Sequence, residues 1–144
     1  MNVNKPAGGV GEESEATMLS ASPEEYMSPG QLAFVRRRLL ADEQALLSAV
    51  KETASHLQQS ETSSDWNDRA SAEEEHTLEL RVRDRERKLL QKIRESLKRI
   101  DDGNYGWCEE TGEPIGIARL LARPTAALCL EAQERREQSK RLFG

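Results

Sequence analysis

The two cysteines stand in sequence frames that match half of a metal-binding pattern. Cys108 begins the run Cys-Glu-Glu-Thr, and Cys129 begins the run Cys-Leu-Glu-Ala. A structural zinc site takes four thiolate or imidazole ligands, commonly from two Cys-x-x-Cys pairs. Here Thr111 and Ala132 hold the second position of each pair, so no zinc is expected. Three interpretations of the thiols stay open: buried small apolar residues, a reversible disulfide, or a weak site for a soft metal.

A pair of carboxylates, Asp65 and Asp68, is the second candidate cluster, in the run DWNDRA that ends at Ala70. Catalytic carboxylates work in pockets that perturb their pKa. At an exposed turn, these two acids are expected to stay ionised and solvated. Two interpretations stay open: Asp68 caps a helix, or the pair is a charged probe that reaches a metal ion or a basic loop in a recess of a partner.

Helical periodicity on both sides of this pair predicts a hairpin. Ser28, Pro29 and Gln31 form a helix-start signal, and apolar residues then recur at helical spacing up to residue 57. A second periodic segment starts near Asp68 and ends at Gly103 or Asn104, where a left-handed residue can close the helix. We expect an antiparallel pair over residues 28–103 with its tip at 61–70.

The facing positions of the two arms are expected to have residue numbers that add to about 132, with an uncertainty of about one helical turn. This register brings His56 opposite His76 near the tip, where both are expected to be solvated helix residues. It also pairs Leu39 with Ile93.

The remaining segments differ in character from the hairpin. Residues 1–27 are expected to be a flexible acidic tail, residues 104–129 a small globular part built from turns and a few apolar side chains, and residues 130–144 a terminal helix. Aromatic residues make up only 4% and charged residues 33% of the 144 residues. An enclosed substrate cavity is therefore not expected, and the chain is predicted not to be an enzyme.

Charge patterning and apolar runs exclude further classes. Residues 61–80 carry a formal charge of −6 and residues 81–99 one of +6. The acidic block disfavours direct DNA binding. No apolar run approaches the roughly 18 residues of a membrane span, and the N-terminus lacks a signal-peptide pattern. We expect a cytoplasmic protein with reduced thiols.

Several motifs resemble the DksA/TraR family of RNA polymerase-binding transcription factors. The similarity runs from about Glu24 to the C-terminus and is strongest in DWNDRA, in the acidic run EEE at 73–75, in LELRVRDRERKL at 78–89 and in GIARLLARPT at 116–125. It implies a mainly α fold with a long antiparallel coiled-coil hairpin, a small zinc-finger-like globular domain and a C-terminal helix. The chain most resembles family members with an incomplete zinc-ligand set.

The resemblance also implies a mechanism. The coil would enter the secondary channel of bacterial RNA polymerase, with Asp65, Asp68 and Ala70 at the active-centre end and Arg85 and Arg119 in polymerase contact. The resemblance also implies a monomer that does not bind DNA directly. It would alter the stability of promoter open complexes together with guanosine tetraphosphate, repressing ribosomal RNA promoters and stimulating some amino-acid biosynthesis promoters.

The resemblance implies a set of alarmone-binding positions as well. These are Leu89, Lys92, Arg123 and Gln133, and Gln133 replaces a family lysine, which weakens the expected affinity for phosphate. The lost ligands at Thr111 and Ala132 suggest a zinc-independent factor that serves when zinc is scarce. Two alternative functions stay open: a transcript-cleavage factor that acts in the same channel, and a coiled-coil adaptor.

Overall fold

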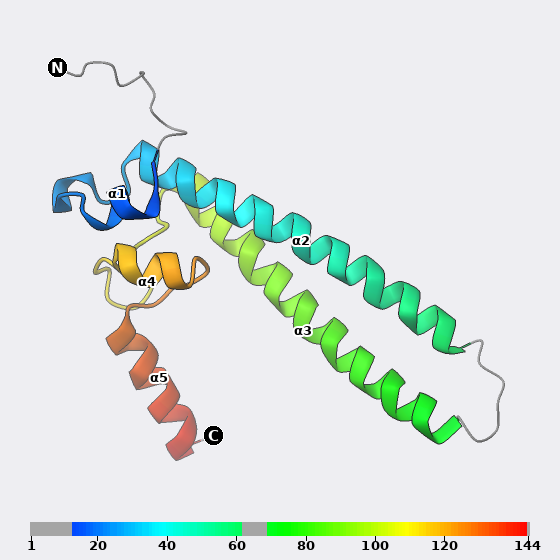
Figure 1. The fold of residues 1–144 in the computed structure, drawn as a ribbon. Coiled ribbons are helices and arrows are strands. Elements are labelled where there is room, and N and C mark those ends of the chain that lie inside the picture. Colours follow the sequence, from blue (N-terminus) through cyan, green and yellow to red (C-terminus); the bar gives the residue numbers. More distant parts are fainter. Residues whose placement is uncertain (1–12, 62–68, 144) are drawn as a thin grey trace. The chain divides into compact units, whose positions relative to one another are not determined.

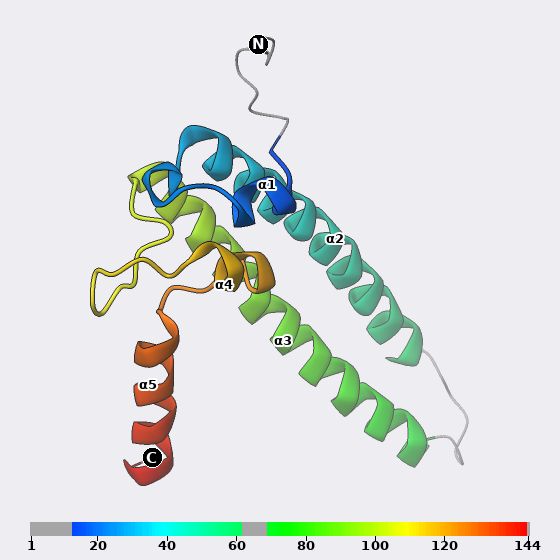
Figure 2. The same ribbon diagram turned by 60° about the vertical axis from the view of Figure 1, so that its left-hand side comes forward.

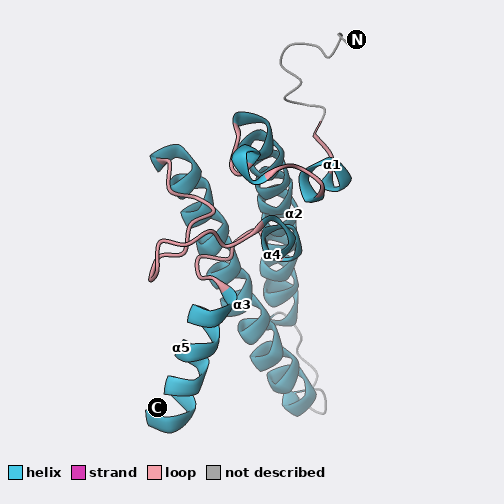
Figure 3. Cartoon of the chain, turned by 90° about the vertical axis from the view of Figure 1, so that its left-hand side faces the viewer, coloured by secondary structure: helices cyan, strands magenta, loops and turns pink. Residues whose placement is uncertain are grey.

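The computed structural model describes residues 13–61 and 69–143. In chain order it contains α1 (Glu15–Leu19), the 3-10 helix η2 (Pro23–Glu25), α2 (Pro29–Glu61), α3 (Arg69–Asp102), α4 (Ile117–Ala122) and α5 (Leu130–Phe143) (Figure 1). The described residues form helices and loops without a β-strand (Figure 3). The predicted mainly α fold class is confirmed. None of the described helices is long and apolar enough to cross a membrane.

The chain divides into two compact units. One contains residues up to 39 and from 95 onward, and the other contains residues 40–94. In the second unit, the segments of α2 and α3 run side by side in opposite directions (Figures 1 and 2). The antiparallel helix pair expected from the periodicity is therefore confirmed.

Polar pairs across this helix pair set its register. Glu43 accepts a hydrogen bond from Arg94 at 3.0 Å, and Thr53 lies 3.1 Å from Glu86. The residue numbers in these pairs add to 137 and 139, so they differ from the expected sum of 132 by five and seven residues, roughly one and a half to two helical turns. The expected pairing of His56 with His76 is wrong, since His56 instead lies 3.5 Å from Glu79. Periodicity alone could not separate neighbouring turns, because apolar residues recur on the same helix face at each turn.

The start of α2 is fixed by local hydrogen bonds. The backbone N–H of Gln31 donates to the Ser28 hydroxyl at 3.3 Å, and the Gln31 side chain accepts from the backbone N–H of Met27 at 2.8 Å. This reciprocal arrangement satisfies donors that the first helical turn leaves free. The predicted cap by Ser28 is thus confirmed, but Gln31 does not complete a capping box, because its side chain accepts from Met27 while the Ser28 N–H donates to the Glu25 carbonyl. Gln31 is almost fully buried there.

The end of α3 is also as predicted. Gly103 adopts a φ of 84°, the left-handed conformation in which glycine carries no steric penalty. The backbone N–H groups of Asn104 and Tyr105 both donate to the Arg99 carbonyl at 3.0 and 3.1 Å. The chain therefore leaves α3 directly into the globular part of this unit.

Within the unit that contains residues up to 39 and from 95 onward, residues 104–129 form turns and the short helix α4. A β-bridge joins Trp107 and Pro114 and closes the loop that carries Cys108. Tyr105 and Leu120 are almost fully buried, and the Tyr105 hydroxyl donates to the Pro124 carbonyl at 2.6 Å. The expected small apolar cluster is therefore present.

The expectation of a flexible tail at 1–27 is wrong for the described residues 13–27. Ser14 caps α1 by accepting a hydrogen bond from the backbone N–H of Thr17. Met18 is only 1% exposed, and α1 packs against α4. A single buried methionine gives no periodic pattern, which is why the sequence suggested a tail. Residues 1–12 lie outside the described part.

Candidate functional site

The predicted tip falls at the boundary of the described residues. Asp65 and Asp68 lie outside the described ranges. Ala70 lies in the first turn of α3. The proposed role of these three positions in a polymerase channel therefore stays a prediction.

The following part of α3 carries a row of unpaired cations. Arg81, Arg83 and Arg85 are exposed and have no hydrogen-bond or ion-pair partner in the described part of the chain. Asp84 lies between Arg83 and Arg85 in the sequence. It binds Arg87 at 2.6 Å and Lys88 at 3.1 Å, and hydrogen bonds from Arg87 and then Lys88 lower the pKa of its carboxyl. Arg87 and Lys88 thus both pair with Asp84. The guanidinium groups of Arg81, Arg83 and Arg85 remain available to an acidic partner.

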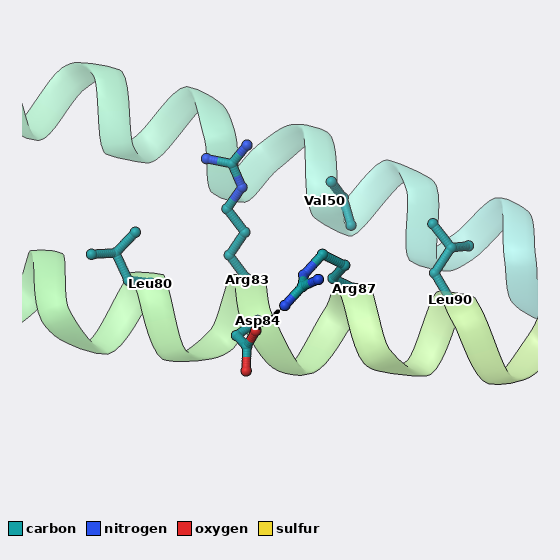
Figure 4. Close-up of a pocket in the computed structure, with 6 residues that line it drawn as sticks. All are labelled: Val50, Leu80, Arg83, Asp84, Arg87 and Leu90. Carbon is teal, nitrogen blue, oxygen red and sulfur yellow. Dashed lines mark hydrogen bonds and ion pairs between the residues drawn. The ribbon is translucent and has the colours of Figure 1, made fainter.

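A shallow groove of about 410 Å³ lies within residues 40–94. Figure 4 shows Val50 pointing into it from α2, while Leu80 and Leu90 line it from α3. Arg83 extends from α3 toward α2, and Asp84 and Arg87 complete the lining. The groove combines an apolar floor with two guanidinium groups, so it can hold an apolar side chain next to a carboxylate.

The positions that the family resemblance implies for alarmone binding fall in both units. Leu89 is 43% exposed and Lys92 is also exposed, and both belong to residues 40–94. Arg123 is exposed at the end of α4 in the other unit. Gln133 lies in the first turn of α5, and its side-chain amide donates to Glu137 at 3.0 Å. That hydrogen bond engages the amide that stands where the family resemblance places a lysine.

Arg119, the second expected polymerase contact, has a structural hydrogen bond. Its Nε donates to the Leu128 carbonyl at 3.0 Å. This bond joins α4 to the segment that leads to Cys129. Arg119 is half-buried.

The four finger positions come together in the globular part. Cys108 is 4% exposed, Cys129 is 9% exposed and Ala132 is fully buried. The Thr111 hydroxyl lies 3.9 Å from the Cys129 sulfur and accepts a hydrogen bond from the backbone N–H of Glu113 at 3.2 Å. The sequence spacing therefore located a cluster that the structure brings together.

The Cys108 thiol is acidified by its surroundings. Burial raises its pKa, but hydrogen bonds from the Thr111 hydroxyl and from the backbone N–H groups of Cys129, Thr111 and Glu110 lower it more. The net result is a pKa of about 6. Hydrogen bonds to the charged form favour that form, so Cys108 is mainly a thiolate at neutral pH.

A four-ligand zinc ion does not fit these residues. Only two of the four positions are thiols, the third is a neutral hydroxyl, and the Ala132 methyl occupies the fourth. Burial of Cys108, Cys129 and Ala132 also leaves little room for water to complete a tetrahedral shell. In the described ranges 13–61 and 69–143, no group of three or more His, Cys, Asp or Glu side chains could hold a metal ion.

Tyr26 is a key residue of this domain that sequence reasoning missed. Its hydroxyl donates to the Gly106 carbonyl at 2.5 Å and accepts from the Gly116 N–H at 2.9 Å. Its ring also packs edge-on against Trp107 with a centroid distance of 5.3 Å. Tyr26 therefore joins both sides of the loop that carries Cys108. Its place near the start of the family resemblance, which begins at about Glu24, was the only signal in the sequence.

Arg99 is a second residue that the sequence analysis did not single out. Its Nη2 donates to the carbonyls of Asn104 and Trp107 at 3.2 and 2.7 Å, and its Nε lies 3.6 Å from Glu109. Its Nη1 is buried without a partner among the described residues. The guanidinium group thus ties the end of α3 to the loop before Cys108.

Comparisons with known proteins agree with this architecture. Residues 31–100 match the family described as DnaK suppressor protein DksA, N-terminal domain, and residues 103–138 match the prokaryotic dksA/traR C4-type zinc finger. The two matches divide the chain between the helix pair and the domain that contains both cysteines. The combination defines a protein of the DksA/TraR class.

Individual relatives identify the family within this class. A protein of Caulobacter vibrioides named RNA polymerase-binding transcription factor DksA is 52% identical over 120 residues, which are 83% of this chain and 84% of the relative. The protein of that name from Escherichia coli K12 is 50% identical over 111 residues, 76% and 74% of the two chains. The chain therefore belongs to the DksA family.

A solved structure supports the same assignment. The structure titled transcription factor DksA2 from Pseudomonas aeruginosa matches with a TM-score of 0.82 and 46% identity. The match covers 89% of this chain and 99% of that chain. The similarity thus includes most of the described helices.

Proposed function

We propose that this protein is a transcription regulator that binds bacterial RNA polymerase directly. The observation that carries the proposal is the 52% identity, over 83% of the chain, to a relative named for that binding. The exposed Arg81, Arg83 and Arg85 support it, because unpaired guanidinium groups suit an acidic protein surface. Arg85 and Arg119 are the proposed polymerase contacts.

The proposed route is the secondary channel of the polymerase. The helix pair enters the channel and carries Asp65, Asp68 and Ala70 to the active centre. The factor then changes the stability of open complexes, which matters most at promoters close to the balance between open and closed states. Ribosomal RNA promoters are repressed, and some amino-acid biosynthesis promoters are stimulated.

Guanosine tetraphosphate is the proposed co-regulator. Leu89, Lys92 and Arg123 contribute to its binding at the polymerase interface, with Lys92 and Arg123 supplying positive charge for its phosphates. Gln133 supplies no charge, and its amide is engaged by Glu137. We therefore propose a response to the alarmone that is weaker than a lysine at position 133 would allow.

Zinc independence is proposed for the domain with Cys108 and Cys129. Support comes from the donor set, in which Thr111 and Ala132 replace thiols, and from protein contacts that close the loop, above all those of Tyr26. A factor of this kind keeps its fold when zinc is scarce. The protein is proposed to act as a cytoplasmic monomer, without catalysis of its own and without contact to DNA.

In vitro transcription from a ribosomal RNA promoter tests this function. The assay contains reconstituted RNA polymerase, the reduced full-length protein and a zinc chelator, with and without the alarmone. Repression that persists with the chelator and strengthens with the alarmone is the expected result. A four-cysteine DksA relative stripped of zinc by the same chelator is the matched control.

Other results would contradict the proposal. Shortening of stalled transcripts on addition of the protein would favour a cleavage factor. Failure to bind polymerase in a pull-down would favour a coiled-coil adaptor. Metal analysis that finds one tightly bound zinc per chain would contradict zinc independence.

A further inference from the structure

Most of the helix pair lacks buried side chains. The buried side chains that the structure describes in α2 and α3 are confined to residues 31–39 and 93–96, and they are Gln31, Val35, Leu39, Ile93 and Ser96. Among the described side chains of residues 40–56 and 71–92, none is buried. Burial of apolar surface is the main favourable term that holds helices together. The two arms therefore have little of this term over most of their length.

Charged side chains of α3 occupy positions that face α2. Glu79 lies 3.5 Å from His56, and Glu86 lies 3.1 Å from the Thr53 hydroxyl. Arg83, between the two glutamates, extends toward α2 (Figure 4). Residues 79, 83 and 86 are spaced by four and three residues, the spacing of inward positions in a coiled coil. Three ionisable groups in succession thus hold positions that are apolar in a stable coiled coil.

The apolar side chains in this part of α3 do not make up for the charged ones. Leu78 is 59% exposed, Val82 is 38% exposed and Leu89 is 43% exposed. Val50 of α2 lines the groove of Figure 4 and is only half-buried. The helix pair therefore leaves much of its apolar surface in water and directs ionisable groups inward.

The polar contacts between the arms are only partly satisfied. Glu79 Oε2 is buried without a hydrogen-bond partner among the described residues, which costs free energy. The Thr53 hydroxyl has one proton, for which the Ala49 carbonyl at 3.0 Å and Glu86 at 3.1 Å compete. The His56 side chain is 72% exposed, so water weakens its attraction to Glu79. Separation of the arms loses little, because water then solvates both carboxylates.

We propose that Glu79, Arg83 and Glu86 form an ionic seam at which the two arms part, while the unit with residues up to 39 and from 95 onward stays folded. Segments with few buried apolar contacts open locally at a lower free energy than the whole protein. An arm without its neighbour is a single helix in water, which is marginally stable, so its backbone amides become free to exchange. The seam is a property of this chain alone and does not depend on the proposed function.

Hydrogen exchange followed by mass spectrometry tests the seam in the reduced full-length protein. After correction for intrinsic rates, amides of residues 44–56 and 75–90 are expected to exchange at least about 100-fold faster than those of residues 31–39 and 93–100. Glu79→Leu replaces the partly unpaired carboxylate with an apolar group, and it is expected to slow exchange in both arm segments about tenfold. Glu74→Leu makes the same change at an exposed position of α3. This matched control is expected to alter the rates less than about twofold.

Equal exchange in the arms and in residues 31–39 of the wild type would overturn the proposal, and this measurement needs no variant. Exchange in Glu79→Leu as fast as in Glu74→Leu would also overturn it. Thr53→Val combined with Glu86→Leu replaces the second polar pair and repeats the test if Glu79→Leu fails to fold. The same slowing of the arms is expected, and its absence would contradict the seam. Polymerase is absent from the experiment, so failure of the proposed function would leave these rates unchanged.

Discussion

Tyr26 and Gly106 are 80 residues apart in sequence, and the Tyr26 hydroxyl donates to the Gly106 carbonyl at 2.5 Å. The same hydroxyl accepts from the Gly116 N–H, and its burial raises the pKa of the phenol, so it stays protonated at neutral pH. One side chain before α2 therefore holds both ends of the loop that carries Cys108. Two of the four zinc-ligand positions lack a thiol in this domain. The Tyr26 contact therefore supplies part of the loop closure that a zinc ion supplies in a four-cysteine finger.

Tyr26→Phe tests this closure. The substitution removes two hydrogen bonds and leaves a half-buried carbonyl and N–H without their partner. We expect a loss of about 1–3 kcal/mol in the free energy of unfolding. Urea denaturation followed by circular dichroism measures it. Phe143→Leu, at a side chain that is 85% exposed, is the control and is expected to change little. Equal stability of Tyr26→Phe and wild type would show that the loop closes without Tyr26.

Gly106→Ala tests the close approach of Met27 to the loop. A Cβ at Gly106 would lie 2.5 Å from the Met27 sulfur, and the residue has a φ of +92°. Gly112→Ala is the matched control, because Gly112 has a φ of +76° and no atom within 4 Å of a Cβ. The control is expected to lose about 1 kcal/mol from backbone strain, and Gly106→Ala clearly more. Equal losses in thermal or urea unfolding would contradict the role of Met27.

Local signals made much of this fold predictable. The Ser28 cap of α2 and the left-handed Gly103 depend on residues close in sequence, and both were predicted. The register of α2 against α3 depends on cross-helix pairs such as Glu43 with Arg94. Repeating apolar positions fit several registers almost equally well, so the register predicted from the sequence differs from the observed one by more than a turn.

The candidate site, like the fold, was predicted only in part from the sequence. Spacing alone located Cys108, Thr111, Cys129 and Ala132. It could not show that the surroundings of Cys108 lower the pKa of its thiol, because that depends on the path of the loop. Tyr26 was missed for a similar reason, since a contact across 80 residues leaves no periodic trace.

The acidified Cys108 thiol makes the stability of the domain depend on pH. Its pKa is about 6 in the folded protein and about 8.5 in an unfolded chain. A lowered pKa stabilises the fold above the unfolded value, and the contribution is lost as pH falls through the folded value. We expect the free energy of unfolding to rise between about pH 6 and 8.5 more steeply in the wild type than in Cys108→Ser. Unfolding in reductant and chelator across this range measures it.

Thr111→Val separates the hydroxyl from the backbone in this effect. The variant loses the side-chain hydrogen bond to Cys108 but keeps the three N–H groups. Its thiol pKa is therefore expected to lie above that of the wild type and below that of an unperturbed cysteine. Thiolate absorbance, titrated in a Cys129→Ser background, measures the shift. An unchanged midpoint would assign the whole effect to the backbone.

Asp68→Asn tests the proposed tip with a change of one charge and no change of shape. The row of unpaired arginines lies further along α3, so polymerase binding is expected to stay within about threefold of wild type, a change below about 1 kcal/mol. Repression at a ribosomal RNA promoter is expected to be mostly lost, because the proposed acid no longer reaches the active centre as an anion. Glu73→Gln, an equal charge change at an exposed position of α3, is the matched control and is expected to repress normally. Full repression by Asp68→Asn would remove the tip from the mechanism, whereas loss of binding would show that Asp68 anchors the complex.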